Sequence, residues 1–408
     1  MRRELANLIL ASATIISGCS KPDVVAQDTP LDDGRQWLDA RATPPSTSPD
    51  LLRAAAANAL NQVAASESLL QRVIKASPKS DSARRSHMLL SRIYLRQGQY
   101  QRLIANLDEW ARQFPGGADI RDERAAMEQF RGLPDQITAA RGLSNLSHGP
   151  DRDFAAPVTI NGKPANYLLD TGAWLSVMTE GEAKRLGLVI REGTGVLSDA
   201  SGKGTKVRTA VASDLSLGAM SFHNVSFAIL PDVEPFRSME VGRGGILGIP
   251  ILLEVGCVRW VKGGTWELGC ATGSSRDSAN LVFFENQLLV AATVSGTSVF
   301  GVLDTGAETT DLNANFARQF ADALARNGVK DTTTIAGVGG TTATESVTLP
   351  TLDFDIGGTQ VALRPAHVTM QRTSALGGKC CVGNIGLDLL LQTGALTIDF
   401  RTMTIRLR

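Results

Sequence analysis

The sequence predicts a multidomain protein in which a small α-helical domain precedes two similar all-β lobes that form one bilobed unit. Three observations favour this fold class. The chain has 408 residues, which is too long for one typical domain. Its composition changes near residue 150, from helical patterns rich in Ala, Leu and Arg to short apolar runs separated by Gly, Asn and Ser. The tetrapeptide Asp-Thr-Gly-Ala occurs twice, in LLDTGAWLS at 168–176 and in VLDTGAETT at 302–310.

The first residues predict export and a membrane anchor. MRRELANLILASATIISGCS has a basic head and an apolar stretch that is too short to span a bilayer comfortably. Its end, Ile-Ser-Gly-Cys, resembles a bacterial lipobox, which implies a signal peptide over 1–19 and a lipid on Cys19. The alternative is a plain signal peptide with an incidental cysteine. By the same resemblance, Ser20 favours a lipid-anchored protein of the bacterial cell envelope, on the outer membrane and facing the periplasm.

Residues 20–50 and 51–145 are expected to form a tether and a helical domain. The tether has several prolines and little apolar periodicity. In the helical domain, Tyr94, Gly98, Tyr100 and Pro115 resemble the spacing of a tetratricopeptide repeat. A generic helical hairpin is the alternative. Either reading predicts a domain that packs on its neighbour or binds a protein partner.

The remainder of the chain is an internal repeat. At an offset of 134 positions (304 − 170), VTINGKPANYLLDTGA lies over ATVSGTSVFGVLDTGA without a gap. Asn-Gly in one copy and Ser-Gly in the other are signals for a tight hairpin. Further on, GILGIPILLEVG lies over GNIGLDLLLQTG at an offset of 138 (386 − 248). We therefore expect lobe 1 over 154–269, a linker over 270–280 and lobe 2 over 281–408.

The order of these elements resembles the retropepsin-like aspartic proteases, including their bacterial members. The shared order is hairpin, apolar strand, Asp-Thr-Gly-Ala, helix, glycine-bearing hairpin and a second apolar-Gly element. The resemblance implies an acid-protease fold with two flaps that close over an extended peptide. It places the flap tips at these residues: Asp199, Ala200, Ser201, Gly202, Gly337, Val338, Gly339 and Gly340.

Two aspartates in matched settings suit peptide hydrolysis. Like charges a few ångströms apart cannot both ionise cheaply, so such a pair holds one proton between them. One carboxylate then accepts a proton from water while the other donates a proton to the carbonyl oxygen. We expect Asp170 and Asp304 to meet across a pseudo-two-fold axis within one chain. The resemblance implies an aspartic endopeptidase acting on peptide or protein substrates, without a cofactor or a metal.

The neighbouring motif residues have supporting tasks. Gly172 and Gly306 allow close approach of the backbone, and the family's threonines, here Thr171 and Thr305, hydrogen-bond across the lobe interface. The motif ends with alanines, Ala173 and Ala307, where pepsins commonly have a hydroxyl that favours a charged carboxylate. We therefore expect a pH optimum in the mildly acidic to neutral range rather than in strong acid.

Two positions after the motif suggest that the lobes differ. Trp174 in lobe 1 corresponds to Glu308 in lobe 2, so we expect the two halves of the cleft to be chemically unequal. Retroviral enzymes have an Arg after the second apolar-Gly element. Here Ile249 and Leu387 occupy those positions, and the ion pair that the Arg would form is absent.

Four cysteines remain if Cys19 is lipidated. In CVRWVKGGTWELGC a two-residue Gly-Gly turn would place Cys257 opposite Cys270, close enough for a disulfide, and two free thiols are the alternative. The state of the adjacent Cys380 and Cys381 is open. No Cys or His spacing suits a metal. With 41 basic and 41 acidic residues, the charge balance does not favour a nucleic-acid partner.

Two other functions are compatible with these features, because a fold does not determine an activity. A non-catalytic protein could use the same cleft to bind peptides or cell-wall fragments. Alternatively, an envelope scaffold could act mainly through the helical domain. The duplicated motif favours the protease reading over both.

Overall fold

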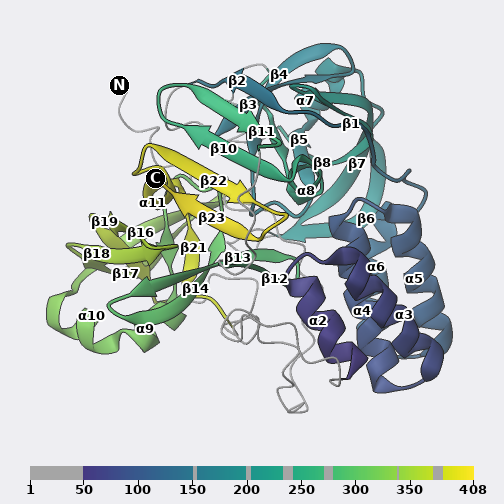
Figure 1. Cartoon of the computed structure of the whole chain (residues 1–408), viewed down its shortest axis with the longest axis horizontal. Helices are drawn as coiled ribbons and strands as arrows, with labels where there is room; N and C mark the ends of the chain where they lie inside the picture. Colours follow the sequence, from purple (N-terminus) through teal and green to yellow (C-terminus); the bar gives the residue numbers. More distant parts are fainter. Residues whose placement is uncertain are drawn as a thin grey trace.

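The computed structural model describes residues 49–149, 154–198, 204–232, 242–270, 279–337, 340–370 and 380–408. These residues form a group of helices and two β lobes (Figure 1). No helix within these ranges is long and apolar enough to cross a membrane. The flap residues from Asp199 to Gly202, together with Val338 and Gly339, lie outside the described residues, as does Cys19.

Consecutive helices form the N-terminal part of the described chain. They are α2 (Asp50–Ala59), α3 (Val63–Ala76), α4 (Asp81–Arg96), α5 (Tyr100–Gln113), α6 (Ala118–Met127) and the 3-10 turn η2 (Glu128–Phe130). Each helix packs on the next. The hydroxyl of Ser80 caps α4 by accepting a hydrogen bond from the Ala83 amide at 3.1 Å.

The helical domain ends earlier than the expected boundary at residue 145. Helical structure stops at Phe130, and two short strands follow, β1 (Ile137–Ala140) and β2 (Ser144–Ser147). Strand β1 pairs with β8 of lobe 1, and β2 pairs with β11. This segment therefore completes sheets of the β lobes, a long-range pairing that local sequence patterns do not reveal.

Lobe 1 contains an eight-stranded sheet with the order β1-β8-β5-β9-β4-β3-β7-β6. Its elements are β3 (Ala155–Ile160), β4 (Lys163–Leu169), β5 (Ser176–Thr179), α7 (Glu180–Leu186), β6 (Arg191–Ser198), β7 (Gly204–Leu217), β8 (Met220–Leu230), β9 (Gly245–Leu247), α8 (Ile249–Val255), β10 (Cys257–Val261) and β11 (Thr265–Leu268).

Lobe 2 contains a ten-stranded sheet with the order β16-β17-β20-β15-β21-β14-β13-β18-β19, in which β12 also pairs with β13. Its elements are β12 (Leu281–Phe284), β13 (Gln287–Val294), β14 (Thr297–Leu303), β15 (Asp311–Leu312), α9 (Ala314–Gln319), α10 (Ala321–Asn327), β16 (Val329–Gly337), β17 (Gly340–Leu349), β18 (Leu352–Ile356), β19 (Thr359–Leu363), β20 (Ala366–Thr369), β21 (Gly383–Ile385), α11 (Leu387–Leu390), β22 (Ala395–Asp399) and β23 (Thr404–Leu407).

The two lobes repeat one pattern of strand pairing. In lobe 1, β3 and β4 form a hairpin, β4 runs parallel to β9, and β5 pairs antiparallel with β9 and parallel with β8. In lobe 2, β13, β14, β21, β15 and β20 repeat the same relations. Both hairpins close through two residues with positive φ, Asn161-Gly162 and Ser295-Gly296, as a type I′ turn requires.

A shared five-stranded sheet joins the two lobes. Its order is β2-β11-β10-β22-β23, so strands from the C-terminus lie beside strands of lobe 1 (Figure 1). The central pair, β10 and β22, is antiparallel from Cys257 opposite Asp399 to Val261 opposite Ala395. Because this sheet takes strands from both copies, it fixes the lobes relative to each other.

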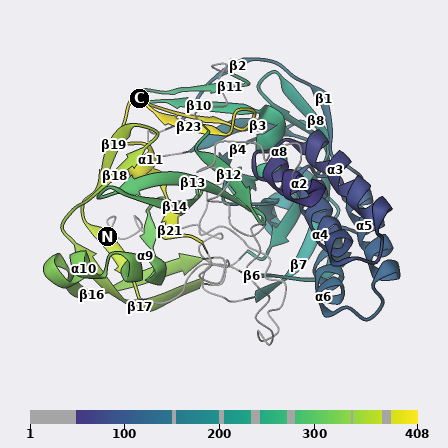
Figure 2. The same cartoon turned by 60° about the horizontal axis from the view of Figure 1, so that its bottom comes forward.

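The helical domain packs on both lobes through a common apolar core. This core includes Trp110 and Phe130 from the helices, Trp174 from lobe 1 and Phe300 from lobe 2. Figure 2 shows α6 beside β6, and the two elements are in contact. The guanidinium of the buried Arg96 lies 4.2 Å from the ring centre of Phe283 in β12. The helices are therefore part of the protein body that positions the two lobes.

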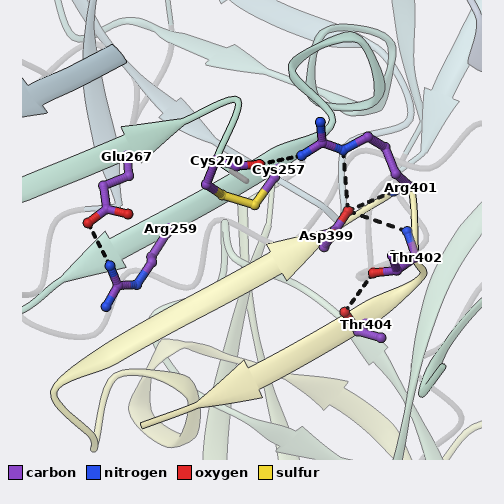
Figure 3. The surroundings of a disulfide bond; sticks show 8 residues. All are labelled: Cys257, Arg259, Glu267, Cys270, Asp399, Arg401, Thr402 and Thr404. Atoms are coloured by element: carbon purple, nitrogen blue, oxygen red, sulfur yellow. Dashed lines mark hydrogen bonds and ion pairs between the residues drawn. A yellow bond between two sulfur atoms is a disulfide. The ribbon is translucent and has the colours of Figure 1, made fainter. Parts of the chain in front are cut away.

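Cys257, at the start of β10, and Cys270, which follows β11, form a disulfide at one end of these strands in the shared sheet, where the Arg401 side chain donates to the carbonyl of Cys270 (Figure 3). The predicted strand register is wrong by one residue. Val261, rather than Lys262, pairs with Thr265, because the Lys262 amide donates to the carbonyl of Gly394 and the residue joins the turn.

The disulfide forms despite that change of register. Cys257 lies opposite Gly269, whose amide donates to the Cys257 carbonyl at 2.8 Å. Gly269 has a φ of +69°, which turns the chain so that the next residue, Cys270, reaches Cys257. Cys380 and Cys381, whose state the sequence left open, form a disulfide between adjacent residues.

Candidate active site

Asp170 and Asp304 follow directly on the central strands of the two lobes. Asp170 comes after β4, and its amide donates to the carbonyl of Leu247 at 3.0 Å. Asp304 comes after β14, and its amide donates to the carbonyl of Ile385 at 3.1 Å. Both aspartates are at most 1% exposed. Strand β9 runs parallel to β4, and strand β21 runs parallel to β14. These two strands therefore hold the two motif loops in equivalent places.

The threonines of the motif connect the two loops reciprocally. The Thr171 amide donates to Oγ1 of Thr305 at 3.0 Å, and the Thr305 amide donates to Oγ1 of Thr171 at 3.1 Å. Each hydroxyl also donates into the opposite lobe, from Thr171 to the carbonyl of Leu303 at 2.7 Å and from Thr305 to that of Leu169 at 2.6 Å. Four buried hydrogen bonds thus fix the spacing of the two aspartates.

The carboxyl group of Asp170 lies against the loop of the other lobe. A Cβ atom at Gly306 would come within 2.3 Å of Oδ2 of Asp170, so the loop tolerates glycine there and no larger residue. Within each loop, the glycine amide donates to the aspartate, from Gly172 to Asp170 Oδ1 at 2.7 Å and from Gly306 to Asp304 Oδ1 at 3.1 Å. These bonds orient both carboxyl groups toward the lobe interface.

The pKa of Asp170 is raised well above the ordinary value of an aspartate. Burial is the main cause, and the negative charge of Asp304 is the second. The backbone amides of Gly172, Ala173 and Gly306 oppose part of this rise. Because the two groups interact strongly, they titrate as a pair.

This raised pKa makes the stability of the protein depend on pH. The folded state favours protonated Asp170. Below the unfolded-state pKa of about 3.9 the group therefore does not destabilise the protein, and as the pH rises from there toward the folded-state pKa the free energy of unfolding falls. At pH 7 we expect Asp170→Asn to be more stable than the wild type and to unfold at a higher urea concentration, because the asparagine side chain stays neutral in the buried site; each unit by which the pKa of Asp170 is raised corresponds to about 1.4 kcal/mol. Near pH 3 the difference should vanish. The exposed Asp353→Asn is the control, and an equal destabilisation by both substitutions at pH 7 would contradict this expectation.

The alanines that end the motif fix the elements behind the site. The carbonyl of Ala173 accepts from the Ile249 amide at 2.8 Å, and that of Ala307 accepts from the Leu387 amide at 2.9 Å. Ile249 and Leu387 begin the short helices α8 and α11. The positions where retroviral enzymes have an Arg therefore bind each motif loop through the backbone amide.

Trp174 does not line the cleft, contrary to the expectation from the sequence. It is 4% exposed and packs edge-on against Phe130 of the helical domain, with ring centres 6.1 Å apart. Glu308, at the corresponding position of lobe 2, is exposed. The two positions therefore differ in burial, and the helical domain contacts lobe 1 directly beside the Asp170 loop.

Sequence reasoning missed Asn384, which contacts the candidate pair. Its side-chain amide donates to Oδ2 of Asp304 at 3.1 Å. The corresponding residue of lobe 1 is Ile246, because Val302 pairs with Asn384 as Leu168 pairs with Ile246. The alignment of the two repeats contained the signal, because Asn384 in the second copy occupies the position of Ile246 in the first copy, two residues before the glycine of the second apolar-Gly element.

Two β-hairpins lead toward the residues that were expected to form the flap tips. In lobe 2, β16 and β17 pair from Val329 opposite Thr348 to Gly337 opposite Gly340. In lobe 1, β6 and β7 pair up to Ser198 opposite Gly204. No group of three His, Cys, Asp or Glu side chains in the described parts of the chain is placed to hold a metal ion.

One comparison with known proteins, the match to a family model, agrees with the family resemblance. The aspartyl protease family model matches residues 156–251. Among solved structures, the chain is similar to a retropepsin-like aspartic protease from Rickettsia conorii, with 19% identity over 33% of this chain and 96% of that one, at a TM-score of 0.24. The search of curated proteins found no match. The tetratricopeptide resemblance of the helices stays a prediction. The match to the aspartyl protease family model thus lies within lobe 1 and includes Asp170, whereas Asp304 lies outside the matched residues.

Proposed function

We propose that the protein is an aspartic endopeptidase whose active site is formed by Asp170 and Asp304 within one chain. The observation that supports this most strongly is the reciprocal set of threonine hydrogen bonds, which joins the two motif loops. Both aspartates of these loops are buried, and the charge of Asp304 contributes to the raised pKa of Asp170. A turn that merely followed a strand would need neither a buried acid nor a matched partner from a second lobe.

The reaction uses one water molecule and the single proton that the pair holds. The ionised carboxylate accepts a proton from the water, whose oxygen attacks the carbonyl carbon of the peptide bond. The protonated carboxyl group donates its proton to the carbonyl oxygen, which gives a neutral tetrahedral diol. The diol then collapses, the C–N bond breaks, and the amine leaves with a proton from the pair. Because both lobes come from one chain, the site forms without a second molecule.

The substrate of this site is an extended peptide. The hairpins β6–β7 and β16–β17 would cover it and pair with its backbone. The flap tips, from Asp199 to Gly202 and from Gly337 to Gly340, would then exclude water during the reaction. We expect apolar side chains on both sides of the cleaved bond, because the strands around the site are rich in Val, Leu and Ile.

The test is a peptide-library digest with the chain from residue 20 onward, with and without a statine-type inhibitor. We expect cleavage of peptides with apolar residues at the cut bond, suppression by the inhibitor, and a maximum rate at mildly acidic to neutral pH. Binding of peptides without any cleavage would favour the non-catalytic reading. A rate maximum near pH 2 would contradict the pH expectation alone.

We propose further that a lipid on Cys19 anchors the protein in the bacterial envelope, with residues 20–50 as the tether. The support is the lipobox-like sequence that precedes the cysteine. Fractionation of cells that express the wild type and Cys19→Ala tests this. We expect the wild type with the membranes and the variant in the soluble envelope fraction, and an identical distribution would contradict the anchor.

A further inference from the structure

The two lobes differ at the position of Asn384, whose side chain contacts Asp304. Strand β9 presents Ile246 beside Leu168, and strand β21 presents Asn384 beside Val302. Both positions are half-buried, and both lie two residues before the glycine of the second apolar-Gly element. The duplicated fold thus places an apolar side chain near one aspartate and a hydrogen-bond donor near the other.

This difference changes the hydrogen bonds of the two carboxyl groups. Asp304 accepts at both oxygens, from the Gly306 amide at Oδ1 and from the Asn384 side chain at Oδ2, each at 3.1 Å. Asp170 accepts from the Gly172 amide at Oδ1, at 2.7 Å. Its buried Oδ2 accepts no hydrogen bond of normal geometry from the described residues, although the amides of Ala173 and Gly306 lie near enough to oppose part of the rise in its pKa. Asp304 therefore has a donor of normal hydrogen-bond geometry at each oxygen, whereas Asp170 has such a donor at Oδ1 alone.

We propose, on the basis of the function proposed above, that Asn384 is a positioning residue that keeps Asp304 ionised and leaves the shared proton on Asp170. A donor to a carboxylate oxygen stabilises the charged form. A buried oxygen without a donor is costly when charged and is best protonated. The proton on Oδ2 of Asp170 would also relieve the repulsion between the two acids.

The other charged groups near Asp304 do not reverse this assignment. The carboxyl group of Asp388, on the following helix α11, is held by the amide and the hydroxyl of Thr310 at 2.8 and 2.6 Å. Glu308, on the motif loop, is exposed. Asp170 is the acid that faces Asp304 from the other lobe, and its raised pKa agrees with its role as the protonated member.

The roles in the reaction follow from this asymmetry. Asp304 accepts the proton of the attacking water, and Asp170 donates its proton to the carbonyl oxygen of the peptide. After attack, the proton taken by Asp304 passes to the departing amine. Asn384 donates its hydrogen bond to the charged carboxylate of Asp304, and this bond weakens when Asp304 takes up a proton and becomes neutral. Asn384 therefore orients the carboxyl group and does not itself transfer a proton.

The direct test is labelling with 1,2-epoxy-3-(4-nitrophenoxy)propane. This epoxide reacts with an ionised carboxylate, so it identifies the charged aspartate without any peptide hydrolysis. The ionised carboxylate attacks an epoxide carbon, a C–O ester bond forms, the ring C–O bond breaks, and the resulting alkoxide takes a proton from water. Mass spectrometry of peptides from the full-length protein then locates the ester. We expect it on Asp304, and an ester mainly on Asp170 would overturn the proposal. An ester on Asp170 is also expected if the side-chain oxygen of Asn384, rather than its NH2 group, contacts a protonated Asp304, and that result would equally contradict the proposal.

A swapped variant is the matched control. Asn384→Ile combined with Ile246→Asn moves the donor to the equivalent place in lobe 1, so the ester should move to Asp170. An unchanged ester on Asp304 would show that Asn384 does not determine which acid is charged. If the swapped protein does not fold, the single variant Asn384→Ser shortens the donor, and we then expect esters on both aspartates.

The pH profile provides a second readout. Loss of the donor in Asn384→Ile should shift the acidic limb of kcat/KM upward by about one pH unit, which is a tenfold loss of rate on that limb. A residue with a merely structural role would lower the rate without moving the limb.

The two proposals can fail separately. An ester on Asp304 without any cleavage would contradict the protease function alone, whereas an inhibitor-sensitive protease labelled on Asp170 would contradict only the role of Asn384.

Discussion

Replacing Asp304 by asparagine should lower the rate of peptide hydrolysis by about 10²- to 10⁴-fold, the range that one general acid or base contributes. The side chain keeps its size and can still contact Asn384 and Gly306, but it cannot accept a proton from water. Asp170→Asn should lose as much. The double variant should lose little more, because the two acids act as one unit. Initial rates on one cleaved peptide measure all three variants.

The control for these substitutions is Asp353→Asn, an exposed aspartate in β18 of the same lobe. It should retain the wild-type rate. Affinity for the statine-type inhibitor separates lost chemistry from lost binding, since the Asn variants should still fold and still bind peptides. A variant at Asp304 that digests peptides at the wild-type rate would contradict the paired mechanism.

Thr171→Val should destabilise the protein by about 2–6 kcal/mol and abolish most of its activity. The hydroxyl donates to the carbonyl of Leu303 and accepts from the Thr305 amide, so its removal leaves two buried backbone groups unpaired, each at a cost of about 1–3 kcal/mol. Valine has nearly the same shape, so packing changes little. Urea unfolding followed by circular dichroism measures the loss.

Two substitutions frame that result. Thr171→Ser keeps the hydroxyl and should keep most of the stability and activity. Thr159→Val removes an exposed hydroxyl from β3 and should change neither. Equal urea midpoints for Thr171→Val and the wild type would show that the reciprocal bonds do not hold the lobes together.

The internal repeat made much of the fold predictable. The apolar strands, the Asn-Gly and Ser-Gly turns and the two Asp-Thr-Gly-Ala motifs are local signals, and each forms the expected element. Their equal order in the two halves indicates equal topology, which the strand pairings of both lobes show. Local signals of this kind survive because the turn geometry depends on the residues of the turn itself.

Pairings that depend on distant partners could not be predicted. Residues 137–147 have no strong strand pattern, and they form strands because β8 and β11 offer free edges. The turn after Val261 contains three residues rather than two, because Lys262 bonds to Gly394 from the far end of the chain. Both corrections come from tertiary contacts that override local preference.

The candidate site shows the same division. The aspartates, threonines and glycines could be identified because they recur as a motif. Trp174 was misplaced because its burial depends on Phe130 of the helical domain, which no pattern near the motif reveals. Asn384 was overlooked because the comparison of the repeats rested on residues that the two copies share. Its side chain can donate a hydrogen bond to Asp304, which the equivalent Ile246 of lobe 1 cannot do.

An equimolar mixture of the Asp170→Asn and Asp304→Asn proteins tests most directly whether one chain forms the whole site. Each variant retains one of the two acids. If the lobes of a single chain pair with each other, no molecule in the mixture has both acids in one site, and we predict no hydrolysis above that of either variant alone, while the wild type cleaves in proportion to its concentration. Recovery of activity in the mixture would show that sites form between chains and would contradict the intramolecular pair.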